Sequence, residues 1–147
     1  MINLIRYRQY WERMACRLDH FVEVLPVTID KEMGKSIQAL PTDSITIFMF
    51  PPLSESAASN ADAFRETNRC VIFLMKKYNP QKRTSYELLE EIQPEIERIK
   101  EYMIADQGRP CAPFSIDLST LETAPETELY GTFAGWSLAF EATSSTL

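Results

Sequence analysis

The stretch LYGTFAGWSLAFEA, residues 129–142, predicts a long antiparallel β-strand with one buried face. Successive side chains of a strand point to opposite faces, and here apolar residues recur at every second position. The predicted buried face carries Ala134, Trp136, Leu138, Phe140 and Ala142. Gly131 and Gly135 favour a bulge or close packing by a neighbouring element.

Two shorter apolar runs predict strands that are buried on both faces. Residues 44–50 (SITIFMF) end at a pair of prolines, and residues 66–78 contain the run CVIFLM. Short, continuous apolar runs bounded by turn residues are typical of such strands. We therefore expect Ile47 and Ile72 to be buried, together with the tryptophan and the phenylalanine of the 129–142 strand.

Two further segments predict strands with weaker patterns. Residues 22–30 are rich in valine, but Pro26 cannot donate a hydrogen bond to a neighbouring strand. This strand should therefore be an edge strand or contain a bulge. Residues 114–118 (FSIDL) alternate between apolar and polar side chains, which also favours a strand.

Apolar residues at helical spacing predict two main helices. The first begins near Asn3, a suitable N-cap, and carries an apolar face from Leu4 to Leu18. The second begins with a capping box formed by Thr84 and Glu87. Pro94 lies inside its apolar repeat and should kink the helix or divide it near Gln93. Gly108 suits a left-handed cap at its end.

The remaining segments read as connections. We expect a connection with one helical turn over residues 31–43, a long loop over 51–65, an acidic turn over 119–128 and a frayed tail over 143–147. Consecutive strands at each end of the chain favour antiparallel pairing. The sequence therefore predicts one α+β domain over residues 1–147. Its mainly antiparallel sheet should have about four to five strands, with the two main helices packed on one face.

The charge of the chain limits the kinds of partner it can bind. The 147 residues carry a formal net charge of −6, which disfavours binding to phosphate backbones, so we expect no nucleic acid. The charge is uneven, because a basic start (Arg6, Arg8, Arg13 and Arg17) contrasts with an acidic segment over 117–141. These could be two solvated faces, or they could meet within one molecule or between two. A contact between charged ends should weaken as salt rises.

The cysteines and the apolar runs bear on location. Three cysteines, Cys16, Cys70 and Cys111, are an odd number without regular spacing, which favours free thiols in a reducing compartment. The N-terminal residues lack the apolar core of a signal peptide. The longest apolar runs are far too short to cross a bilayer. We expect a cytoplasmic protein with no membrane segment.

No arrangement of residues specifies a chemistry. His20 is the single histidine, beside Asp19, and no nucleophile motif accompanies the pair. Cys16 and His20 stand four residues apart, but two ligands do not make a zinc site. The glutamates of the second helix, Glu90, Glu91, Glu95, Glu97 and Glu101, read as a solvated face. We therefore predict no catalytic, cofactor-binding or metal-binding residues, no cofactor and no enzyme activity.

Two motifs carry a family resemblance. The chain has Phe48-Met49-Phe50-Pro51-Pro52 at the end of one strand and Gly135-Trp136-Ser137-Leu138-Ala139-Phe140-Glu141 in another. With the order of elements, these resemble small tail-completion or tail-terminator proteins of phages and prophages, in particular prophage-type proteins of gut Bacteroidetes. The resemblance implies a structural protein of virion assembly that forms rings at the end of a tail tube.

The resemblance also implies the partners. They would be tail-tube proteins or further copies of the chain, and the protein would be cytoplasmic or virion-associated. Self-association should use the 51–65 segment and the charged ends, because such rings need complementary surfaces. The alternatives are a small protein-binding module or accessory domain, and a hydrolase with an unrecognised carboxylate pair.

Overall fold

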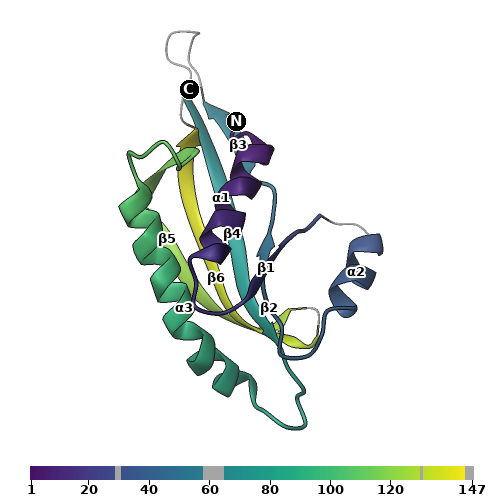
Figure 1. The fold of residues 1–147 in the computed structure, drawn as a ribbon. Helices are drawn as coiled ribbons and strands as arrows, with labels where there is room; N and C mark the ends of the chain where they lie inside the picture. Colours follow the sequence, from purple (N-terminus) through teal and green to yellow (C-terminus); the bar gives the residue numbers. More distant parts are fainter. Residues whose placement is uncertain (29–30, 58–64, 130, 145–147) are drawn as a thin grey trace.

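A computed structural model describes residues 1–28, 31–57, 65–129 and 131–144 of the chain. Within these residues the chain forms three helices and a six-stranded sheet (Figure 1). The elements in chain order are α1 (Leu4–Cys16), β1 (Val22–Pro26), α2 (Lys31–Gln38), β2 (Ile45–Met49), β3 (Leu53–Ala57), β4 (Arg65–Lys77), α3 (Ser85–Asp106), β5 (Phe114–Leu129) and β6 (Phe133–Ser144). None of the described helices has both the length and the hydropathy needed to span a membrane.

The predicted α+β class and the mainly antiparallel sheet are confirmed, but the described sheet has six strands, more than expected. Its order is β1-β2-β4-β6-β5, and β3 pairs with β4 outside this path. The expectation that consecutive strands pair antiparallel holds for β5 and β6 and is wrong for β1 and β2, which are parallel. Parallel neighbours need a crossover connection. Helix α2 supplies part of that crossover, and Pro26 lies on an edge strand as predicted.

Several predicted connections are regular elements. Residues 31–38 form α2 rather than a single turn, and β6 extends to residue 144, inside the expected tail. The prediction of a loop over 51–65 is wrong for residues 53–57, which form β3. Residues 58–64 lie outside the described residues. The expected turn over 119–128 is part of β5, whose pairing shifts between Asp117 and Glu122. These polar segments form strands because long neighbours, β4 and β6, offer them backbone partners.

The helix ends follow the predicted local chemistry. The Asn3 side chain accepts a hydrogen bond from the Arg6 N–H at 3.0 Å. Thr84 and Glu87 form the reciprocal capping box at the start of α3. The prediction of a divided helix is wrong, because α3 runs continuously through Pro94. Pro94 is exposed, so water can bond the carbonyl that its missing N–H leaves unpaired.

The capping box yields a first prediction. We expect Thr84→Ala to lower the free energy of unfolding by about 1 kcal/mol, because the side chain accepts from the Glu87 N–H at 3.2 Å. Gln93→Ala, exposed in the middle of the same helix, is the control and should change it by less than about 0.5 kcal/mol. Urea unfolding followed by circular dichroism measures both. Equal effects of the two substitutions would contradict a stabilising role for the cap.

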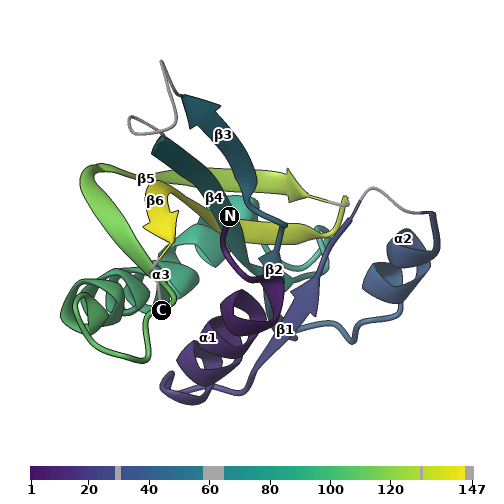
Figure 2. The ribbon, with the colours of Figure 1, turned by 90° about the horizontal axis from the view of Figure 1, so that it is seen from above.

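The two faces of the sheet carry separate apolar clusters. On one face, Ile72 of β4 and Phe140 of β6 lie in one cluster with Trp11 of α1 and Ile96 of α3. On the other face, a smaller cluster joins side chains of β2, β4 and β6 to Ile37 of α2. Figure 2 shows α1 and α3 below the sheet and α2 set apart beside β1 and β2. Alternation along the strands therefore serves two cores of different size.

The residues predicted to be buried in the core are buried, with one exception. Ile47, Ile72 and Phe140 are buried. Trp136 is only partly buried and packs against the edge of the larger cluster, where its indole N–H donates to the Leu89 carbonyl at 3.0 Å. A tryptophan that must satisfy its N–H commonly takes such a border position.

Candidate interaction surface

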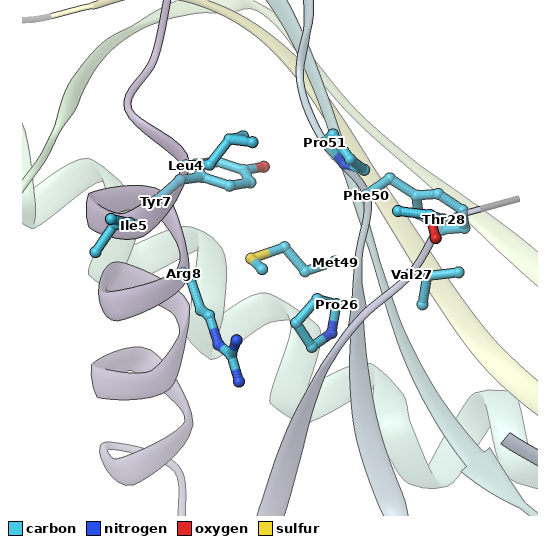
Figure 3. A pocket seen from close by; sticks show the side chains of 10 residues that line it. All are labelled: Leu4, Ile5, Tyr7, Arg8, Pro26, Val27, Thr28, Met49, Phe50 and Pro51. Atoms are coloured by element: carbon cyan, nitrogen blue, oxygen red, sulfur yellow. The ribbon is translucent and has the colours of Figure 1, made fainter. Parts of the chain in front are cut away.

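An apolar groove lies between the first turns of α1 and the ends of β1 and β2 (Figure 3). Its volume is about 280 Å³. Three short segments, distant in the sequence, line it: Leu4, Ile5, Tyr7 and Arg8; Pro26, Val27 and Thr28; Met49, Phe50 and Pro51. They meet because α1 packs against β1 and β2.

The groove has a buried floor and an exposed apolar rim. Tyr7 and Met49 are buried, whereas Leu4 and Ile5 on the neighbouring turn are 55% and 69% exposed. Burial, with a smaller contribution from Cys70, raises the pKa of Tyr7 well above its ordinary value. The floor is therefore uncharged at neutral pH. Leu4, expected on the buried face of the first helix, is instead an exposed rim residue.

The one charged group in the groove lies at its edge. Arg8 pairs with Glu12 at 2.8 Å, and both side chains are about half exposed. Small-molecule sites usually have about 300–1,000 Å³ and a few convergent polar groups. This groove is slightly smaller and almost wholly apolar, so it suits one or two apolar side chains of a protein better than a polar substrate.

The residues weighed for catalysis or metal binding are not assembled into a complete site within the described part of the chain. His20 lies at the end of the α1 segment, with Nε2 3.6 Å from Glu95 Oε1. Cys16 is exposed, and no group of three or more potential ligands is found among the described residues. All three cysteines are described and are free, and burial raises the pKa of Cys70 to about 12.

The prediction that the glutamates of α3 form one solvated face is wrong for Glu95. Glu95 is buried beside the apolar stripe, near Arg98 at 3.7 Å, and one of its carboxylate oxygens has no hydrogen-bond partner in the described residues. Glu91 accepts from Lys76 at 2.5 Å and pairs with Arg83 at 2.6 Å. Burial raises the pKa of Glu91, but these two cations outweigh it, and the pKa is lowered.

The basic side chains of α1, and that of Arg17 at its C-cap, are largely engaged within the molecule. Arg17 pairs with the buried Asp106 at 2.7 Å, and the Tyr10 hydroxyl donates to the same oxygen at 3.0 Å. Arg13 donates to the Cys111 carbonyl at 3.1 Å. The basic helix therefore contacts the end of α3 and the loop that follows it. Arg8, Arg13 and Arg17 bond to Glu12, the Cys111 carbonyl and Asp106, respectively, all outside the acidic 117–141 segment.

Comparisons with known proteins add no relatives. No protein-family model matches the chain. No curated protein matches its sequence either.

Proposed function

We propose that the protein is a non-enzymatic assembly subunit that associates with further copies of itself through the groove beside α1. The observation that carries this proposal is the pair of exposed aliphatic side chains, Leu4 and Ile5, at the rim of an apolar groove. Clustered apolar exposure of this kind marks protein interaction sites. A ring subunit of the phage tail-terminator type, cytoplasmic or virion-associated, is the specific form that the sequence resemblance favours.

The composition of the surface fits a protein partner. Interfaces combine an apolar centre with a polar rim and are enriched in aromatic residues, methionine and arginine. The groove has Tyr7, Met49 and Phe50 inside and Arg8 at its border. A partner side chain that enters it would remove the exposed rim from water, at roughly 25 cal/mol for each Å² of apolar surface buried.

The β3–β4 hairpin provides a neighbouring contact surface. Residue Pro51 lines the groove and β3 begins two residues later, at Leu53, which is exposed. Within the described residues, β3 pairs with β4 alone, so its other edge presents unpaired backbone groups. Ion pairing of Arg69 with Glu55 at 3.4 Å adds a side-chain link across the hairpin. The groove and this edge supply adjoining parts of one interface.

A test compares two substitutions of equally exposed residues. We expect the wild-type mass, measured by light scattering, to rise with protein concentration. Ile5→Ser should weaken this association about tenfold or more, because apolar anchors carry most of the binding energy. Tyr86→Ser is the control, since Tyr86 is also 69% exposed but lies on α3, away from the groove.

Salt distinguishes the groove from the charged ends. Association through the apolar groove should weaken less between low and high salt than a contact made only of exposed charges, which weakens as the Debye length falls. A monomer at every concentration would contradict self-assembly and favour the binding module, in which a different protein fills the groove. Equal effects of Ile5→Ser and Tyr86→Ser would show that the groove is not the interface.

A further inference from the structure

Phe21 is the most exposed of the described large apolar side chains, at 85%. It lies between α1 and β1, immediately before Val22. The two residues before it are tied to α3, because Asp19 pairs with Arg98 at 2.5 Å and His20 lies 3.6 Å from Glu95. The ring is thus presented to solvent from an anchored segment, which lowers the entropy cost of using it in a contact.

Phe21 and the groove lie at opposite ends of the same edge strand. Phe21 precedes the first residue of β1, and Pro26, the last residue of β1, lines the groove. Five strand residues span about 17 Å. The ring therefore cannot reach the groove of its own molecule, but a second copy placed along the β1 edge can supply it.

The groove matches an aromatic ring in chemistry and charge. The Met49 thioether lies at its centre in Figure 3, and sulfur–aromatic contacts are favourable. Arg8 at the border can approach the face of the ring. The exposed Glu23 lies two residues from Phe21 and gives Arg8 an opposite charge to meet. The existing pair of Arg8 with Glu12 is a surface pair whose two side chains are about half exposed, and such pairs contribute little, so it can be exchanged.

We propose that Phe21 of one copy inserts into the α1 groove of the next, so that copies join head to tail along the β1 edge. This inference rests on the self-association proposed above and names its contact. Because the ring and the groove are different surfaces, the contact is heterologous. Repetition of a heterologous contact generates a closed ring or an open filament, and it does not stop at a two-fold dimer.

Mixing two variants tests this contact. Phe21→Ser removes the ring and keeps the groove, whereas Ile5→Arg obstructs the groove and keeps the ring. We expect each variant alone to associate at least about tenfold more weakly than wild type. An equimolar mixture should form a one-to-one dimer and nothing larger, because only one productive contact is left. Tyr86→Ser should assemble like wild type, and unchanged thermal midpoints would show that both variants fold.

The outcomes separate the contact from the proposed function. If Phe21→Ser assembles like wild type while Ile5→Arg does not, the groove is an interface with a different occupant, and the head-to-tail contact is wrong. If both variants stay monomeric when mixed, the two surfaces do not complement each other, and the contact is again wrong. A monomeric wild type would overturn the contact and the self-assembly together.

Discussion

Phe140→Ala is expected to lower the free energy of unfolding by about 3–5 kcal/mol. Phe140 is buried on the face of the sheet that carries the larger apolar cluster, and it pairs with Cys70 of the neighbouring strand β4. Its ring lies 5.5 Å from that of Phe114, between centroids, and both belong to the cluster that includes α1 and α3. Truncation would leave a cavity between the sheet and the two helices that the surrounding side chains cannot fill, so both the transfer energy and the packing contacts are lost.

Phe21→Ala makes the same chemical change at an exposed position and serves as the control. Because Phe21 is 85% exposed, the free energy of unfolding should change by less than about 0.5 kcal/mol. Denaturant unfolding at a protein concentration where the chain is monomeric measures both variants. A loss below about 1 kcal/mol for Phe140→Ala would mean that β6 does not present this face to the helices.

The central strands and the helix ends were predictable because their signals are local. The apolar runs that predicted β2 and β4, and the alternation that predicted β6, follow directly from the period of a strand. The capping box of α3 is a four-residue pattern with its own hydrogen bonds, so no tertiary information is needed. Pro26 indicated an edge strand because proline has no backbone N–H to donate to a second neighbouring strand.

The wrong predictions concern segments whose structure depends on pairing with strands elsewhere in the chain. β3 (LSESA) has a polar composition without a strand pattern, and it is extended because it pairs with the first residues of β4. The middle of β5 contains Pro125, yet it pairs with Trp136 of β6 at the edge of the sheet. The parallel pairing of β1 with β2 depends on a crossover that the sequence between them does not reveal.

The groove could not be predicted for a similar reason. Leu4, Val27 and Met49 each resemble ordinary core residues in their own segments. Only the packing of α1 against β1 and β2 decides that the rim is exposed and the floor is buried. The adjacent pair Leu4-Ile5 was the available signal, because two consecutive large apolar residues cannot both occupy a narrow helical stripe.

Gly135→Ala is expected to destabilise the protein by about 3 kcal/mol or more. Gly135 lies in β6, where it pairs with Met75 of β4. A Cβ at this position would overlap the Leu74 carbonyl oxygen and stand 2.9 Å from the Met75 Cα. These are backbone atoms at the centre of the sheet, so no rotamer change can relieve the overlap, and the strands must separate.

Gly34→Ala is the matched control and should have the opposite sign. Gly34 lies inside α2, and a Cβ there would meet no atom within 4 Å. Alanine favours a helix interior over glycine by about 1 kcal/mol, so this variant should be more stable than wild type. Thermal unfolding of both variants therefore compares one substitution in two backbone environments. A Gly135→Ala variant as stable as wild type would show that β4 and β6 do not approach each other as closely as described.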